Sequence, residues 1–198
     1  MRYNTVQLPW LADNVAVFGG KDNKIQDNVL SDTVGFGAGI AISTRFNPAP
    51  FAGTTIVERN TLIRTGGREP SWNQDFGAIW LFTGDKPINA NIIIKNNVVT
   101  DSTYQGLYIN GPFGINRDSD HRVTIQNLVI DGTGTWGIHV NSSVTGAVYL
   151  DRVIVRNTKV GKLFNAVGPA FELREESGGA DPGNMGDNGG PVTQGDRS

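Results

Sequence analysis

The sequence predicts an all-β protein, a parallel β-helix of about six coils. Two repeated patterns and one feature of composition support this prediction. The first pattern is a short apolar alternation centred on Asn, and its six copies lie 24 to 37 residues apart. The second pattern follows after a short turn and reads Asn or Gly, then apolar, any residue, apolar. Gly makes up 26 of the 198 residues. Two short strands in each repeat of this length are typical of solenoid coils. A Greek-key sandwich is the alternative, but it does not explain paired motifs in a fixed order.

The Asn-centred pattern predicts a ladder of side-chain amides at one corner of the coils. Asn tolerates left-handed backbone and bonds local backbone groups, so it suits tight bends. We therefore expect each amide to bond to the next coil. The expected ladder positions are Asn4, Asn28, Asn60, Asn97 and Asn127, with Arg152 in the sixth place.

The second pattern predicts one sheet with an inward and an outward row of side chains. Successive residues of a strand point to opposite faces. The expected copies begin at Asn14, Gly39, Gly77, Gly106, Gly137 and Gly161. The alternation directs Val15, Ile40, Leu107 and Ile138 inward, and Ala16, Ala41, Tyr108 and His139 outward.

Composition excludes several classes of protein. The formal charge is −2 and the pI about 5.6, without the basic stripe of a nucleic-acid binder. No apolar run approaches the ~18 residues that span a bilayer. Cys is absent and His occurs twice, which argues against a thiolate or histidine metal centre. We expect neither a metal nor a cofactor.

We expect residues 1–176 to form the β-helix and residues 177–198 to be a disordered tail rich in Gly and Asp. A solenoid needs capping units at its ends, yet Asn4 is already a ladder position. The first coils of the helix therefore look missing. The exposed edge predicts either upstream coils or self-association.

Long connections in a solenoid map to loops that often form a binding face. Three of the four longest connections directly follow an outward-facing strand, so we expect them to wall one side of a groove. The four connections are 44–53, 65–76, 83–90 and 111–120.

Aromatic and polar side chains on or beside the outward strands suit a polysaccharide, because an aromatic ring offers a flat apolar body. The substrate-binding candidates are Arg45, Phe46, Trp72, Trp80, Tyr104, Gln105, Tyr108 and Asn110, with Phe18 and His139 beside them. Packing in the core or in a loop is the alternative for each ring, and the register leaves open whether Trp80 faces groove or core. Glycoside hydrolysis usually needs two carboxylates. The candidates are Asp13, Asp75 and Asp101, for which an ordinary turn position is the alternative.

Several unusual strings occur in order along the chain. They are NTVQLPWLADNVAVFGGKDNKIQDNVLSDT, GIAISTRFNP, TLIRTGG, FGAIW and DSTYQGL. Over about residues 2–158 they resemble the catalytic β-helix of glycoside hydrolase family 87, the α-1,3-glucanases and mycodextranases. The resemblance implies a right-handed helix, hydrolysis of α-1,3-linked glucan with inversion, Asp carboxylates as catalytic groups, and secretion. It also implies substrate contact for the residues in the matching strings: Arg45, Phe46, Trp80, Tyr104 and Gln105.

The family's catalytic Asp pair follows a Gly just before the segment that resembles NTVQLPW, and no Gly-Asp-Asp occurs in this chain. The catalytic residues are therefore unknown, and the resemblance predicts a partial catalytic domain that supplies the substrate groove. A polysaccharide-binding β-helix without catalysis and a truncated structural fragment are the alternatives. A polysaccharide lyase is a fourth, but the cluster of basic and calcium-binding residues it needs is absent from the sequence.

Overall fold

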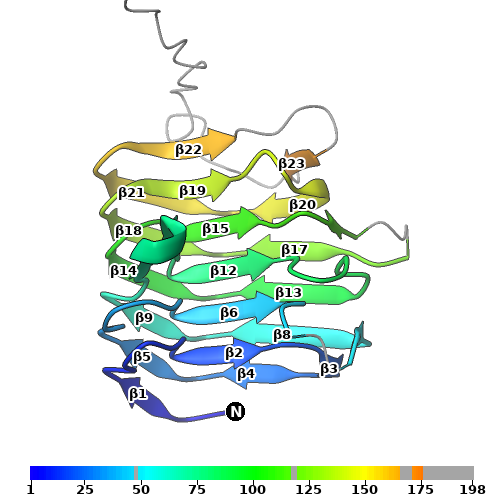
Figure 1. The fold of residues 1–198 in the computed structure, drawn as a ribbon, viewed down its shortest axis with the longest axis horizontal. Helices are drawn as coiled ribbons and strands as arrows, with labels where there is room; N and C mark the ends of the chain where they lie inside the picture. The colour runs from blue at the N-terminus through cyan, green and yellow to red at the C-terminus, as the bar shows by residue number, and fades with distance from the viewer. Residues whose placement is uncertain (47–48, 117–119, 166–170, 176–198) are drawn as a thin grey trace, which may run out of the picture.

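The computed structural model describes residues 1–46, 49–116, 120–165 and 171–175. It is a right-handed parallel β-helix in which the coils rise from β1 to β22 (Figure 1). Each coil passes through three sheets in the same order. The predicted fold is confirmed, with six strands in each of two sheets. The predicted tail at 177–198 lies outside the described residues.

The first sheet contains short strands that lie between two corners of each coil. Its strands, in spatial and chain order, are β1 (Thr5–Gln7), β5 (Val29–Ser31), β9 (Thr61–Ile63), β14 (Val98–Ser102), β18 (Val129–Thr133) and β21 (Ile154–Thr158).

The second sheet carries the predicted outward row. Its strands are β2 (Val15–Val17), β6 (Ile40–Ser43), β12 (Ile79–Phe82), β15 (Leu107–Asn110), β19 (Trp136–Val140) and β22 (Gly161–Asn165).

The third sheet closes the coil. Its strands are β4 (Lys24–Gln26), β8 (Thr54–Glu58), β13 (Asn91–Lys95), β17 (Val123–Gln126), β20 (Thr145–Asp151) and β23 (Phe171–Glu175), with β16 (Gly114–Ile115) also paired to β20.

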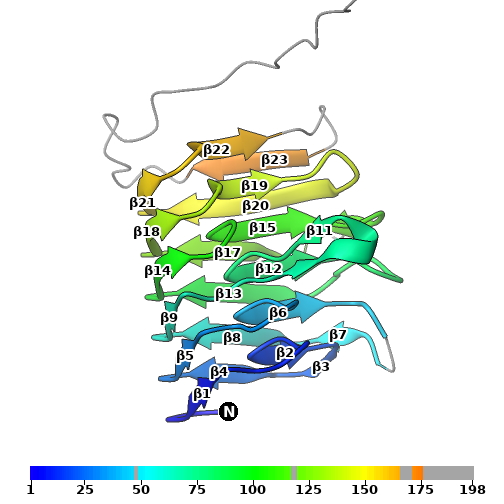
Figure 2. The ribbon, with the colours of Figure 1, turned by 60° about the vertical axis from the view of Figure 1, so that its left-hand side comes forward.

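Two smaller elements lie in the connections. Strands β3 (Gly20–Lys21) and β7 (Phe51–Ala52) pair in parallel. The antiparallel pair β10 (Arg68–Glu69) and β11 (Gln74–Asp75) encloses the 3-10 turn η1 (Pro70–Trp72). This excursion stands out from the stack beside β12 and β15 in both views (Figures 1 and 2). Within the described ranges, no helix is long and apolar enough to cross a membrane.

The core is a column of aliphatic side chains inside the three sheets. Along the second sheet, Val15, Ile40, Ile79, Leu107 and Ile138 stack in register and are buried, as the alternation predicts. Burial of this continuous column is the main favourable term for folding.

Two copies of the second pattern lie one residue away from the predicted register. Ile79 pairs with Ile40, so Ala78 and not Gly77 is the counterpart of Gly39. Gly161 pairs with Trp136, so the last copy is also shifted by one residue. Gly39 itself has no room for a side chain, because a Cβ there would lie 2.7 Å from the Ala78 carbonyl oxygen.

Each coil turns from the third sheet into the first at a single left-handed residue. The φ angles of these six corner residues fall between 47° and 57°. The backbone N–H groups of the first five of them donate to the following coil. The corner residues are Tyr3, Asp27, Arg59, Asn96, Asn127 and Arg152. Left-handed backbone costs an ordinary residue about 1 kcal/mol or more, so bonding between coils must hold these corners.

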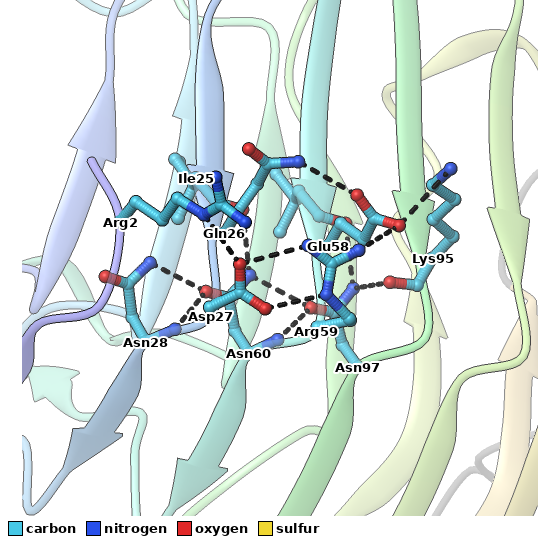
Figure 3. A network of polar contacts seen from close by, with 11 residues as sticks. Arg2, Ile25, Gln26, Asp27, Asn28, Glu58, Arg59, Asn60, Lys95 and Asn97 are labelled. Atoms are coloured by element: carbon cyan, nitrogen blue, oxygen red, sulfur yellow. Dashed lines mark hydrogen bonds and ion pairs between the residues drawn. The ribbon is translucent and has the colours of Figure 1, made fainter.

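The Asn ladder stands next to these corners, and it contains four residues, of which all but Asn4 are buried. Each Oδ1 atom after the first accepts two hydrogen bonds from the Asn of the preceding coil, one from the backbone N–H and one from the side-chain amide. Figure 3 shows Asn28, Asn60 and Asn97 of this ladder. The members are Asn4, Asn28, Asn60 and Asn97. The prediction that the ladder continues at Asn127 and Arg152 is wrong by one residue. Those two are corner residues, and Leu128 and Val153 occupy the ladder position in the last two coils.

Charged side chains form a second ladder outside the amides (Figure 3). Asp27 accepts hydrogen bonds from Arg59 at 2.6 Å and from Arg2 at 3.0 Å, so it joins three coils. The bonds from Arg59 and Arg2 lower the pKa of Asp27. Exposed pairs of this kind contribute little stability, so the buried amides are the main polar contribution at this corner.

Candidate functional site

A cleft of about 320 Å³ lies over the outer face of the second sheet at β2 and β6. Its walls come from connections on both sides of these strands. The lining residues are Leu11, Ala12, Asp13, Ala16, Phe18, Phe36, Arg45, Phe46 and Trp72. The cleft therefore occupies the place predicted for a groove, at the first two coils.

The outward row of the second sheet explains why the cleft is confined to these coils. In register, the row reads Ala16, Ala41, Trp80, Tyr108, His139 and Phe164. The first two positions carry a methyl group and the next four carry rings. Space above the sheet exists over Ala16, which is exposed, and it ends at Ala41, which is fully buried in the cluster that contains Trp80.

An aromatic layer covers the outer face beyond the cleft. Phe36 lies 5.8 Å from Phe76, Phe76 lies 4.8 Å from Trp80, and Trp80 stacks on Phe82 at 4.7 Å, each measured between ring centroids. Trp80 is 2% exposed. Its side chain therefore points outward from the sheet, yet it is buried beneath the connections that precede β6 and β12.

Three further substrate-binding candidates are buried in or beside this layer. Asn110 accepts a hydrogen bond from Nε1 of Trp80 at 2.6 Å. Tyr108 packs within the aromatic layer. Gln105 lies 3.5 Å from Nδ1 of His139. All three are less than a tenth exposed, and none of them lines the cleft.

Asp13 and Arg45 form a largely buried ion pair in the wall of the cleft. Oδ2 of Asp13 and Nη2 of Arg45 are 3.6 Å apart, and the two side chains are 7% and 16% exposed. Oδ1 of Asp13 accepts a hydrogen bond from the backbone N–H of Ala38 at 2.6 Å. Burial raises the pKa of Asp13, and the Ala38 bond and the Arg45 charge partly oppose that rise. Burial lowers the pKa of Arg45, and the negative charge of Asp13 opposes that decrease.

Three rings surround the guanidinium of Arg45. Its Cζ atom lies 4.8 Å from the ring centroid of Phe46, 5.2 Å from that of Trp80 and 5.5 Å from that of Phe18. Cation–π contacts of this kind fix a guanidinium in place. Arg45 therefore joins the aromatic layer to the open cleft.

Two rings of the cleft stand in solvent. Phe46 is 67% exposed and Trp72 is 68% exposed. Trp72 ends η1, and the N-cap residue Glu69 accepts a hydrogen bond from the backbone N–H of Ser71 at 3.0 Å. The β10–β11 pair and this cap therefore hold Trp72 at the rim.

The remaining candidates lie outside the cleft lining. Tyr104 is half-buried in the connection before β15. Asp75 pairs with Arg68 at 3.0 Å, and burial raises the pKa of Asp75 while Arg68 opposes the rise. Asp101 is an exposed residue within β14 and has left-handed backbone with φ 52°. The structure thus brings Asp13, Phe18, Arg45, Phe46 and Trp72 together in the cleft, and the other candidates do not line it.

Sequence reasoning missed three residues of the cleft, namely Leu11, Ala12 and Phe36. Phe36 lies between Gly35 and Gly37 in the connection that leads to β6. An aromatic residue between two glycines in such a connection was the available signal. Among the described residues, no three His, Asp or Glu side chains gather as a metal site would require.

Comparison with known proteins places this geometry in a family. The family model described as alpha-1,3-glucanase catalytic domain D2 matches residues 3–179. None of the curated proteins compared matches the chain significantly.

Solved structures of such glucanases have the same fold. The catalytic unit of the thermostable GH87 α-1,3-glucanase from Streptomyces thermodiastaticus strain HF3-3 is 30% identical, with a TM-score of 0.75. That match covers 89% of this chain and 34% of the other. Two structures of a GH87 α-1,3-glucanase catalytic domain variant, in complex with nigerose and with tetrasaccharides, are each 26% identical, with TM-scores of 0.67 and 0.69. Each of these covers 80% of this chain and 32% of the other.

The chain spans about a third of the length of these solved chains. The family match extends over most of the described coils. The chain belongs to the α-1,3-glucanase catalytic domains of glycoside hydrolase family 87.

Proposed function

We propose that the cleft at β2 and β6 binds glucosyl units of α-1,3-glucan and supplies part of the substrate groove of a glucan hydrolase. The observation that carries this proposal is the cleft itself, an apolar hollow with two exposed rings and one buried carboxylate–guanidinium pair. Apolar walls with a few convergent polar groups are typical of ligand sites. Structures of related catalytic domains hold nigerose and tetrasaccharides.

The residues of the cleft have separate roles in this proposal. Phe46 and Trp72 stack against the sugar rings, because their exposed faces line the hollow. Arg45 and Asp13 bond to hydroxyl groups at the wall. Trp80 supports Arg45 from behind, and Tyr108 and Asn110 stabilise the layer to which Trp80 belongs. Gln105 lies against His139 beside that layer.

Hydrolysis of a glycosidic bond needs two carboxyl groups, roughly 5 to 9.5 Å apart. Among the described residues that line the cleft, Asp13 is the single carboxylate. We therefore propose that the complete catalytic domain hydrolyses the glucan with carboxylates outside this cleft. The segment in hand covers about a third of such a domain. We further propose that the protein acts outside the cell, where an insoluble glucan is found.

A binding β-helix without catalysis is the second candidate function. The observation that favours it is the same single carboxylate in the cleft lining. Both candidates require the cleft to bind glucan, and they differ in turnover.

The test is a pull-down of the purified chain on insoluble α-1,3-glucan, with dextran and pectin as controls. We expect binding to α-1,3-glucan alone. Trp72→Ala should weaken binding about tenfold, because stacking on an exposed ring is lost. Trp10→Ala is the matched control, since Trp10 is 74% exposed and does not line the cleft.

Release of reducing ends from the same glucan tests whether this chain holds its own catalytic pair of carboxylates. Binding with release indicates that this chain holds a working pair of carboxylates, and Asp13, Asp75 and Asp101 then become the substitutions to make. Binding without release supports a groove that needs the rest of its domain, or a binding module. Equal binding of the wild type and Trp72→Ala would overturn the assignment of this cleft.

A further inference from the structure

The ion pair between Asp13 and Arg45 differs from the other pairs of the described residues in its length. The other described pairs measure 2.5 to 3.4 Å between nitrogen and oxygen. The Asp13–Arg45 pair measures 3.6 Å, which is too long for a good hydrogen bond. It is also more deeply buried than the exposed pairs at the corners, such as Arg64 with Asp32.

Physical reasoning predicts the reverse order of lengths. Exposed pairs are solvated and can separate at little cost, whereas a buried pair must have good geometry to offset the desolvation of both charges. A buried pair that is stretched leaves bonding capacity on both partners. Oδ2 of Asp13 therefore has room for a donor, and the guanidinium of Arg45 retains donors for an acceptor.

The surroundings prevent the two groups from closing the gap by themselves. The bond from the Ala38 N–H to Oδ1 fixes the carboxylate of Asp13. The rings of Phe18, Phe46 and Trp80 hold the guanidinium. Nε of Arg45 is buried and has no hydrogen-bond partner among the described residues.

A hydroxyl fits between a carboxylate acceptor and a guanidinium donor. A hydroxyl donates one hydrogen bond and accepts others through the same oxygen atom. A ligand carboxylate would pair with Arg45 but would be repelled by Asp13, and an ammonium group would meet the opposite conflict. The pair thus favours a neutral polyhydroxylated ligand over a uronate polymer.

We propose that Asp13 and Arg45 share a single sugar hydroxyl, which donates to Oδ2 of Asp13 and accepts from the guanidinium of Arg45. This inference rests on the proposed function, because it assigns the polar contact within the same cleft. The shared hydroxyl completes the geometry of the buried pair. The pair in turn sets the depth at which the sugar ring stacks beside Phe46 and Trp72.

The test is isothermal titration calorimetry of the chain with an α-1,3-linked glucotetraose. Asp13→Asn and Arg45→Lys should each weaken binding roughly 10- to 100-fold, the range for loss of a hydrogen bond to a charged group. The double variant should be about as weak as the weaker single variant, because both substitutions remove one shared contact. Asp32→Asn and Arg64→Lys are the matched controls, an exposed pair at 2.6 Å that is absent from the cleft lining.

A second measurement uses the wild-type chain and avoids any effect of substitution on folding. Deoxyfluoro analogues of nigerose replace one hydroxyl at a time with fluorine, which cannot donate. We expect one position to lose binding tenfold or more and the remaining positions to change it little.

The outcomes separate this inference from the proposed function. If the wild type does not bind the oligosaccharide, the proposed function fails and this inference fails with it. If the wild type binds and every fluoro analogue binds equally well, the shared hydroxyl alone is overturned. Multiplicative losses in the double variant would also overturn it, because they would indicate two separate contacts.

Discussion

The side-chain amide of Asn60 donates a hydrogen bond to Oδ1 of Asn97 at 3.0 Å, across the boundary between two coils. The same Oδ1 atom accepts the backbone N–H of Asn60 at 2.9 Å. Asn60 also donates to the carbonyl oxygen of Ile25, so one buried side chain contacts three coils. A buried amide with all its bonds made is stable, and the same amide with partners removed is costly.

Asn60→Ala should lower the free energy of unfolding by ~3 kcal/mol, because it leaves the backbone N–H and the amide of Asn28 without their acceptor. Asn127→Ala is the matched control at an exposed corner, and it should cost about 1 kcal/mol through left-handed backbone strain. Urea unfolding followed by circular dichroism measures both. Equal losses in the two variants would contradict a special role for the buried ladder.

Trp80→Ala should lower the free energy of unfolding by ~3 to 5 kcal/mol, as expected for a large side chain removed from a packed layer. Trp80→Phe keeps a ring in the layer but removes the bond to Asn110, so it should cost about 1 to 2 kcal/mol. Chemical denaturation gives the two values. A small loss in Trp80→Ala, together with weaker glucan binding, would instead mean that the indole works as an open platform.

Ala16→Trp should abolish glucan binding and leave the melting temperature nearly unchanged, because Ala16 is exposed, points outward and lines the cleft. The new ring would occupy the space that the alanine leaves open. Thr124→Trp places the same side chain on the outer face of the third sheet and should not affect binding. The pull-down on insoluble α-1,3-glucan checks both variants, and normal binding by Ala16→Trp would move the site away from this cleft.

The folded protein should lose stability in acid because of His139. Burial lowers the pKa of this residue from 6.5 to about 4. The ring lies between Tyr108 and Phe164 at centroid distances of 4.8 Å. The unfolded chain binds a proton at this residue below about pH 6.5, and the folded chain does so only below about pH 4. The contribution of neutral His139 is therefore complete above pH 6.5 and is lost as the pH falls from 6.5 to 4.

His139→Phe should reduce this pH dependence, because phenylalanine does not titrate. Melting temperatures of the wild type and the variant between pH 4 and pH 7 measure the difference. The carboxylates of the chain affect both proteins alike. The difference between the two curves of melting temperature against pH therefore reports the titration of the His139 imidazole. Parallel curves would show that His139 keeps an ordinary pKa.

The sequence predicts the coils because strand alternation and burial are local and periodic. The inward column at Val15, Ile40, Leu107 and Ile138 could be assigned from period alone. The end of the Asn ladder could not, because Asn127 is a good residue for a left-handed corner as well as for a ladder position. Composition cannot decide between two adjacent positions that both suit Asn.

The cleft was harder to predict than the coils, since outward-facing side chains are not necessarily exposed. Trp80 and Tyr108 point away from the core, but the connections that carry Phe36 and Phe76 fold over them. Ala16 was assigned to the correct face, yet its importance lies in the small volume of its side chain. Such effects depend on contacts between distant segments, which a period in the sequence does not encode.

The left-handed corners divide the chain into parts that can change length and parts that cannot. The turn from the third sheet into the first is made at a single residue, such as Asp27 or Arg59, so an insertion there would break the alignment of every later coil. The connections on either side of the second sheet carry no such restriction, and they hold most of the cleft lining. Insertions and deletions can therefore reshape the glucan site, in evolution or by design, while the stack beneath it keeps its alignment.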